Sequence, residues 1–363
     1  MSRTYKATGI NLKGQPIGEA DRLLTILTPE FGLIRAVAKG SRKQPSKFGG
    51  RGELFVVNQL LIARGRSLDK IAQAETVTSY PGLGRNLAKL AVSQYLAELT
   101  LFQALSDQPQ VALFDALNAH LKQLETLPTA ETEDGAHAAI AAMLVQATLD
   151  LLTLAGIVPQ LDRCCLTQVA IEPVLEQSNW MAGFSAASGG AIAPAELERL
   201  IQEDLVPTPR KRNQSANRLS SMSAYSAAGQ SESASVAAET ADNSYPTAVS
   251  WRRSPSPHRT RLRHSRDRVL RLTALELLLL QQLTAPAVAS EEVADGSPVS
   301  QKGAVPPPIF ATSNIEVPDP IWLNLERILR QYAQYHFGRP IRSATLLDTC
   351  FSSLLIADPP LQP

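Results

Sequence analysis

Hydrophobic and polar residues alternate through roughly the first eighty residues with the two-residue period of β-strands. The alternating runs are short, and Gly or Pro lies between most of them. They lie at 8–12, 22–27, 33–40, 53–58 and 60–64, with 71–78 as a sixth candidate. Because successive side chains of a strand point to opposite faces, each run can bury one face and expose the other. Five or six short strands in so few residues predict a small closed barrel rather than an open sheet.

From about residue 85 the hydrophobic period lengthens to that of an α-helix. Apolar side chains recur every three or four residues through 87–102, 114–124 and 140–154, which predicts three helices that each bury one face. Gly156 and then Pro159 end the third helix, because Gly adopts the left-handed conformation of a helix C-cap and Pro cannot continue a helix.

Two later stretches lose this periodicity. Residues 207–267 are rich in Ser, Ala, Arg and Asn, and residues 284–318 are rich in Pro and Ala. Too little apolar surface is present there to offset the entropy of ordering the chain, so both stretches are predicted to be disordered. Helical periodicity returns between them and again after them, where Asp319 and Pro320 supply the start signals of a helix.

These patterns predict an α+β multidomain protein, in which a small β-barrel precedes an all-α helical region interrupted by two disordered insertions. The predicted parts are a barrel at 1–82, a helical domain at 83–206, a Ser- and Arg-rich insertion at 207–267, a helix at 268–283, a Pro- and Ala-rich linker at 284–318, and C-terminal helices packing on the helical domain at 319–363.

Positive charge is concentrated in the predicted barrel. Residues 1–89 hold 15 of the 35 Lys and Arg but only 6 of the 34 Asp and Glu, a net charge of +9 in a chain whose overall net charge is +1. Segregated positive charge is typical of a surface that binds the phosphate backbone of nucleic acid. Residues 90–205 carry a net charge of −12, so the helical region is not expected to lie along nucleic acid.

The densest basic segment is the loop at 39–51, which has five cationic side chains and no acidic one. The alternative interpretation is a solvated loop on an ordinary barrel, but the charge excess extends beyond the loop and favours binding. Aromatic residues are sparse, so backbone contacts should dominate, with weak sequence preference and a steep salt dependence. The candidate contacts are Arg22, Arg35, Lys39, Arg42, Lys43, Lys47, Arg51, Arg64 and Arg66.

Two further segments are candidates for a binding role. The helical stripe at 322–337 sets Trp322, Arg327 and Arg330 among apolar residues, a combination that suits an acidic, hydrophobic peptide tail, although such a stripe more often forms core. The Arg- and Ser-rich run at 251–266 can add nonspecific phosphate contacts, and the same composition is also common in inert insertions.

Metal, catalytic and membrane functions find little support in the chain. Cys164 and Cys165 are adjacent and Cys350 is distant, so the paired C-x-x-C spacing of a zinc ribbon is absent. No phosphate-binding loop, nucleophile elbow or metalloprotease motif occurs, which predicts a protein that is not an enzyme and has no cofactor. The apolar runs are short and the N-terminus lacks a secretory signal, so we expect a soluble cytoplasmic protein without a membrane partner.

Several segments resemble the RecO family of bacterial recombination mediators. Residues 5–12, 18–28 and 32–40 with the following basic loop are similar to the family's N-terminal OB-fold. Residues 156–161 with Cys164, then Phe184-Ser185 and Gly189-Gly190, are similar to the stretch around its zinc module, and residues 332–343 to its closing helices. The chain departs from the pattern of two C-x-x-C pairs, since Thr167 occupies the second position and Ala193 lies in the region of the third.

The resemblance implies a DNA repair protein that binds single- and double-stranded DNA and anneals complementary strands. It also implies partners: the acidic tail of single-strand-binding protein, RecR, and RecA through its loading onto gapped DNA. A nucleoid-associated location in the cytoplasm follows, and zinc is not expected. Two alternatives stay open: a protein-interaction adaptor whose acidic helical body is the active surface, and an RNA-binding OB protein, which would prefer strands with 2′-hydroxyl groups.

Overall fold

The computed structural model describes residues 4–43, 46, 48–128, 136–205, 269–285 and 317–355. Nearly all of the two stretches predicted to be disordered lie outside the described residues. The predicted contact Lys47 lies outside them as well. The chain divides into two units, 1–198 with 267–363 and 199–266, and only 199–205 of the second unit is described. The account below concerns the first unit.

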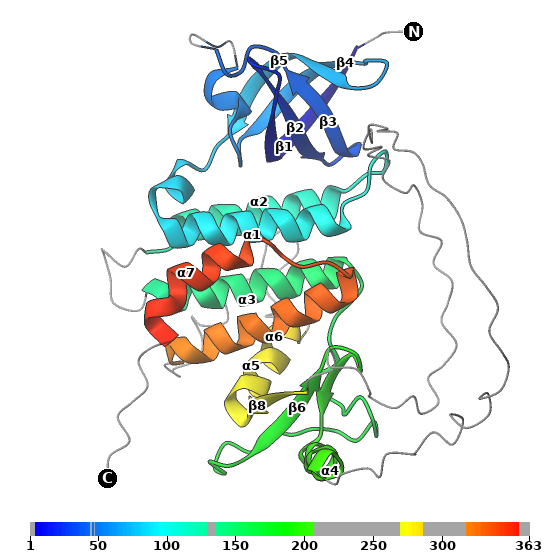
Figure 1. Cartoon of the computed structure of the whole chain (residues 1–363), viewed down its shortest axis with the longest axis vertical. Coiled ribbons are helices and arrows are strands. Elements are labelled where there is room, and N and C mark those ends of the chain that lie inside the picture. Colours follow the sequence, from blue (N-terminus) through cyan, green and yellow to red (C-terminus); the bar gives the residue numbers. More distant parts are fainter. Residues whose placement is uncertain are drawn as a thin grey trace, which may run out of the picture. The chain divides into compact units, whose positions relative to one another are not determined.

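The N-terminal strands form a closed barrel in the order β1-β2-β3-β5-β4 (Figure 1). Its strands are β1 (Thr4–Ile17), β2 (Asp21–Thr28), β3 (Gly32–Ala38), β4 (Val57–Ala63) and β5 (Asp69–Thr78). All neighbours are antiparallel except β3 and β5. β1 is long enough to pair with two strands, its first half with β4 and its second half with β2, and this shared strand closes the barrel. The predicted small barrel of the OB type is confirmed.

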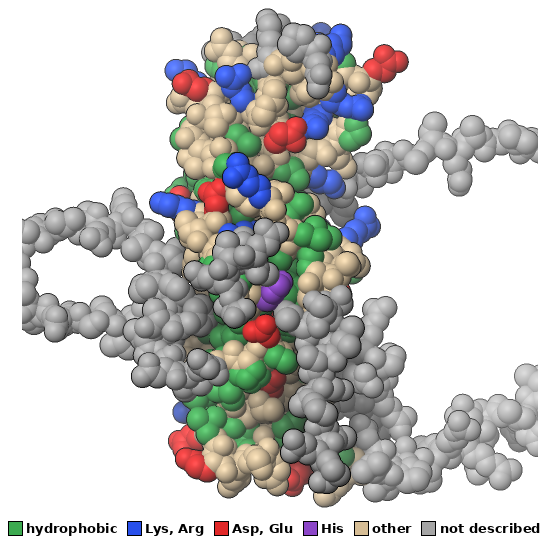
Figure 2. All heavy atoms as spheres, turned by 90° about the vertical axis from the view of Figure 1, so that its left-hand side faces the viewer, with side chains coloured by type: hydrophobic (Ala, Val, Ile, Leu, Met, Phe, Trp, Pro, Cys, Tyr) green, Lys and Arg blue, Asp and Glu red, His purple; other side chains and the backbone are tan. Residues whose placement is uncertain are grey.

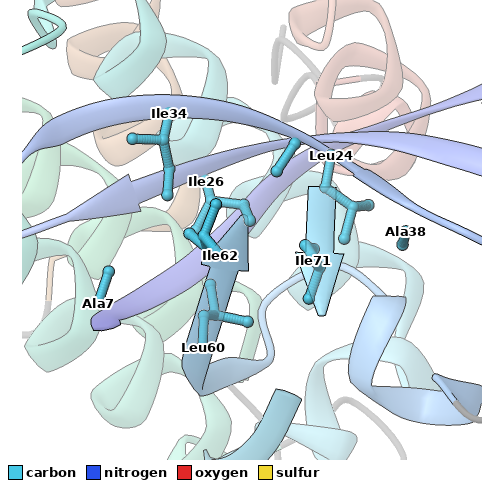
Figure 3. Packing of buried hydrophobic residues seen from close by; sticks show 9 residues of the cluster. Ala7, Leu24, Ile26, Ile34, Ala38, Leu60, Ile62 and Ile71 are labelled. Carbon is cyan, nitrogen blue, oxygen red and sulfur yellow. The ribbon is translucent and has the colours of Figure 1, made fainter. Parts of the chain in front are cut away.

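The barrel core consists of the inward-facing side chains of the alternating runs (Figure 3). Ile26 and Ile62 are fully buried, and Leu24, Leu60 and Ile71 surround them. Burying one such aliphatic side chain contributes about 1.5–3 kcal/mol. Polar and charged residues occupy the outward positions of the same strands. Because of this alternation, the cationic side chains of the strands point to solvent.

The helical region is built around one apolar helix. α3 (Ala136–Leu154) packs against α1 (Leu87–Gln103), α2 (Val111–Thr126) and α6 (Asp319–Phe337), and α1 also packs against α7 (Ala344–Leu355). Gly156 follows α3 with a φ of +71°, and the Ile157 N–H donates to the Leu152 carbonyl, as in a glycine-capped helix end. The expected end of the third helix is therefore confirmed.

Among the described residues, α3 is the one helix that is long and apolar enough to cross a membrane, judged by length and composition alone. It has 19 residues and a mean hydropathy of 1.5. Of the 18-residue window that has this hydropathy, 61% is buried inside the protein. That burial is what the core helix of a helical domain requires, and it accounts for the apolar composition without a bilayer.

A small sheet, which the periodicity did not predict, lies within the helical region. It has the order β7-β6-β8, with β6 (Met181–Ser185), β7 (Gly190–Ile192) and β8 (Leu270–Thr273), and it is accompanied by α4 (Pro194–Leu205) and α5 (Ala274–Thr284). The prediction of a helix over all of 268–283 is therefore corrected, because 270–273 is a strand. Thr273 stops the strand and starts α5 by forming a capping box with Glu276.

One carboxylate ties the first helix to the last. Glu98 of α1 accepts hydrogen bonds from the backbone N–H groups of Arg342 (3.0 Å) and Ser343 (2.8 Å) and from the Ser343 hydroxyl (2.7 Å). These groups lie at the N-terminal end of α7, where backbone donors lack helical partners and a negative charge is favoured. The fold class predicted from the sequence, a barrel followed by helices, is confirmed.

Candidate nucleic-acid interface

Strand register brings two cations together on the outer face of the barrel. Thr25 of β2 pairs on one side with Lys13 of β1 and on the other with Arg35 of β3. Residues directly opposite each other in antiparallel strands point to the same face, about 5 Å apart between Cα atoms, so Lys13 and Arg35 lie in one row about 10 Å apart. Both side chains belong to exposed residues.

The start of the β3–β4 loop folds back on the β1–β2 turn and brings three more cations to that end of the barrel. The Gly40 N–H donates to the Asp21 carboxylate (2.8 Å), and the Arg42 N–H donates to the Ala20 carbonyl (2.9 Å). The Arg42 guanidinium also donates to the Gly18 carbonyl (3.3 Å). These contacts hold the loop against the strands that carry the row above.

We call these five exposed cations the cationic face: Lys13, Arg35, Lys39, Arg42 and Lys43. Figure 2 shows Lys and Arg side chains gathered over the barrel on the side of the molecule that it displays. In OB-type barrels the outer surface of strands 2 and 3, with the loop between strands 1 and 2, is where oligonucleotides bind. The cationic face overlaps that surface at Arg35, and its loop residues lie against the β1–β2 turn.

Arg22, another predicted contact, has a partner inside the protein. Its guanidinium lies 2.7 Å from the Glu53 carboxylate and donates to the Gly52 carbonyl (3.4 Å), and 32% of its side chain is exposed. Arg22 therefore fastens the far part of the β3–β4 loop to β2, and a phosphate would have to compete with Glu53 for it.

Arg51 lies in a short 3-10 helix, η1 (Gly49–Gly52), that two buried amides hold in place. The Asn11 side chain donates to the carbonyls of Arg51 (2.8 Å) and Glu53 (2.9 Å), and the Asn58 side chain donates to the Arg51 carbonyl (2.9 Å). Both Asn residues are at most 1% exposed. The backbone that carries the exposed Arg51 side chain is thus fixed by the barrel interior.

Arg64 and Arg66 lie apart from the η1 loop, in the connection between β4 and β5, and both are exposed. The Arg64 guanidinium lies 5.4 Å from the centre of the Tyr5 ring, whose hydroxyl donates to Asp69 (2.7 Å). Burial, and then this hydrogen bond, raise the pKa of Tyr5 above its ordinary value. The ring therefore stays neutral at physiological pH and offers Arg64 a cation–π platform.

The sequence prediction omitted Lys13. The alternation around it was readable: Leu12 is 4% exposed and Lys13 is exposed, as neighbours on a strand should be. What the sequence could not supply is the register with Thr25, which places Lys13 in one row with Arg35.

The stripe of α6 proposed as a tail-binding groove is largely core. Trp322 is 3% exposed, and Arg330 donates to Glu326 (2.6 Å) and to Asp348 (2.9 Å). Burial alone would lower the pKa of Arg330, but the hydrogen bonds to Asp348 and Glu326 outweigh it and raise the pKa. The geometry thus supports the core alternative for Trp322 and Arg330, and Arg327 is the exposed member of the set.

The residues around Cys164 do not fit a zinc site. Its sulfur accepts a hydrogen bond from the Ala193 N–H (3.3 Å), so the structure brings together the positions where the family pattern would have thiols. Burial raises the pKa of Cys164, but hydrogen bonds from Ala193 and from Thr167 outweigh it and lower the pKa. Zinc needs four N, S or O donors, and the described residues contain no cluster of three or more His, Cys, Asp or Glu.

Comparison with known proteins agrees with the geometry. The family model for the N-terminal domain of recombination protein O matches residues 1–80, and the model for its C-terminal domain matches residues 84–201. The DNA repair protein RecO of a Nostoc species is 45% identical over 353 residues, 97% of this chain and 98% of the relative. The protein of the same name from Acaryochloris marina is 45% identical over 354 residues, 98% of this chain and 97% of the relative.

These matches also bear on the insertions. A match over 353 of 363 residues must include most of 207–267, so relatives of this kind have a similar length and the insertion is not peculiar to this chain. The chain therefore belongs to the RecO family, and it is a DNA repair protein with an OB-type barrel at its N-terminus.

Proposed function

We propose that the cationic face binds single- and double-stranded DNA through phosphate contacts and that the bound strands anneal with their complements. The observation that supports the proposal most is the row of Lys13 and Arg35 on the outer barrel, continued by the cations of the β3–β4 loop. Arg64, Arg66 and Arg51 extend the positive surface, and Lys47, outside the described residues, belongs to the same loop by sequence.

The mechanism is electrostatic. Two complementary strands repel each other, and neutralising part of their phosphate charge on a common surface lowers that repulsion and releases condensed counterions. Because phosphates carry no sequence information, the Watson–Crick edges of most bases stay available for pairing. Such a reaction consumes no nucleotide and needs neither a catalytic residue nor a bound metal.

The proposal includes the partners that the family resemblance implies. RecR, the acidic tail of single-strand-binding protein and, through loading onto coated DNA, RecA are expected to work with this protein in the cytoplasm at the nucleoid. A cationic surface suits an acidic tail by charge complementarity. Arg327, exposed on α6, is the residue of the predicted groove that can still take part.

The full chain should accelerate the annealing of two complementary oligonucleotides without ATP. We expect a rate at least about 10-fold above the spontaneous rate at low salt, falling steeply as salt rises because counterion release drives binding. A fluorescence-quenching assay with labelled strands measures the rate. An ATP requirement, or no acceleration at any salt concentration, would contradict the proposal.

Two further measurements separate the rival functions, one of partner binding with and without DNA and one of DNA against RNA strands. An adaptor that uses the acidic helices would bind its protein partner equally well with and without DNA. An RNA-binding protein would anneal or bind strands with 2′-hydroxyl groups better than DNA of the same sequence.

A further inference from the structure

A hollow of about 360 Å³ opens beside η1, between the β3–β4 loop and the end of β5. Its apolar lining comes from Phe48 and Val56, and three hydroxyl-bearing residues, Ser46, Thr76 and Ser79, also line it. We call it the Phe48 pocket. Its volume is within the range of sites that hold small organic ligands, about 300–1,000 Å³.

The remaining wall is shaped for close approach by a ligand. Gly49 and Gly50 line the pocket, and a Cβ placed on either glycine would have no atom within 4 Å, so the space in front of their backbone is open. Arg51 follows directly and adds a cation to the rim. The site thus combines one aromatic face, hydroxyl groups and positive charge.

The barrel fixes the backbone of 48–53 before any ligand arrives. The buried side chains of Asn11 and Asn58 fix the Arg51 carbonyl, and the Thr76 hydroxyl donates to the side-chain amide oxygen of Asn58 (3.3 Å). The Ser46 hydroxyl oxygen accepts hydrogen bonds from the N–H groups of Phe48 (3.1 Å) and Gly49 (3.3 Å). Backbone that is already fixed at 48–53 loses little entropy on binding, which favours a specific contact.

A phosphate alone does not account for this lining, because a phosphate gains nothing from Phe48 and Val56. An unpaired nucleobase does: it offers a flat apolar face to the ring, polar edges to the hydroxyls and an attached phosphate to Arg51. We propose that the Phe48 pocket receives one unpaired nucleobase of the DNA strand bound by the cationic face. The inference rests on the proposed DNA binding and adds to it a contact that distinguishes single strands from duplex.

The test compares two strands and two proteins. A 15-nucleotide oligothymidine and an abasic strand of the same length carry the same phosphates, and only the first has bases. We expect the full-chain protein to bind oligothymidine at least about 5-fold tighter than the abasic strand, the lower end of what one stacked base contributes. Phe48→Leu should bind the two strands equally, and Phe48→Tyr should keep the preference.

Controls separate a lost base contact from a lost fold. Phe48 also packs against the barrel core. The Phe48→Leu variant is therefore a valid test only if its affinity for duplex and for the abasic strand equals that of the parent protein. Should that affinity fall, Gly50→Val is the second variant, because Gly50 lines the pocket, a side chain added there enters open space, and the change removes no core group. Gly50→Val should likewise abolish the preference.

The outcomes for the two proposals differ. Equal affinity of the parent protein for both strands, or a preference that survives both variants, overturns the pocket while leaving DNA binding intact. Failure of the parent protein to bind any strand at low salt overturns the proposed function itself.

Discussion

Replacing all five residues of the cationic face by alanine is expected to reduce affinity for single-stranded DNA by at least about 100-fold at 0.15 M salt. Each lost phosphate contact lowers the slope of log K against log salt by about 0.7, so the slope should fall by about 3.5. If a contact contributes nothing to the binding constant K at 1 M salt, this slope means that it contributes about 0.6 units of log K at 0.15 M salt. Fluorescence anisotropy over a series of salt concentrations measures both quantities.

A matched pair of double variants shows whether position or total charge matters. Lys13→Ala with Arg35→Ala should lower the slope by about 1.4. Lys122→Ala with Arg163→Ala removes the same charge from exposed residues of the acidic helical region and should leave the slope unchanged. Equal losses in the two variants would mean that only the net charge of the protein matters, and the cationic face would have no special role.

Gly32→Ala is expected to lower the free energy of unfolding by about 3 kcal/mol, because two costs add at one position. Gly32 has a φ of +64°, a conformation that costs an alanine about 1–2 kcal/mol. A Cβ there would also lie 2.0 Å from the Leu105 carbonyl oxygen and 2.6 Å from that of Gln108, both in the connection between α1 and α2. Relieving backbone clashes of this kind shifts structure and costs further stability.

Gly32 matters because the β2–β3 turn contacts that connection through backbone hydrogen bonds. The Leu33 N–H donates to the Leu105 carbonyl (2.8 Å), and the Gln110 N–H donates to the Pro29 carbonyl (2.8 Å). Thermal unfolding followed by circular dichroism should show a decrease in Tm of about 5–10 °C.

Gly18→Ala is the control for this substitution. Gly18 has a similar φ of +59°, but a Cβ added there would have no atom within 4 Å, so its replacement carries the conformational cost alone. The difference between the two variants isolates the contact between the turn and the α1–α2 connection. Identical decreases in Tm would show that this contact contributes nothing to stability.

The barrel and the helices were predictable because local pattern and tertiary burial agree. The alternation at 22–27 reappears as the buried Leu24 and Ile26 of β2, and the helical stripe at 140–154 reappears as the buried face of α3. The small sheet was not predictable by the same means. Its strands are three to five residues long, and β8 reads as the first turn of a helix until its pairing with β6 is known.

Some site residues could likewise be predicted from the sequence, and others could not. Charge identifies Arg35, Lys39, Arg42 and Lys43 directly, since each is exposed and lies on or beside the barrel. Lys13 required the strand register. A lone carboxylate such as Glu98, which as a single residue reads as part of a solvated helix face, instead caps α7 from 244 positions away. Contacts between residues so far apart in sequence leave no periodic signal.

The Phe48 pocket could not be inferred from the sequence for a related reason. Its members come from one loop and one strand end, and their chemistry becomes informative only when Asn11 and Asn58 fix the loop against β5. From the sequence alone, Phe48 is one of several aromatic residues expected to fill the barrel core.

Lysine footprinting of the full chain tests the location of the DNA most directly. An amine-acetylating reagent, applied with and without saturating single-stranded DNA and read by mass spectrometry, reports the accessibility of each lysine. We expect DNA to protect Lys13, Lys39 and Lys43 and to leave Lys122 of α2 unchanged. Protection of Lys122, with undiminished labelling of the three barrel lysines, would contradict the claim that DNA phosphates bind to the barrel.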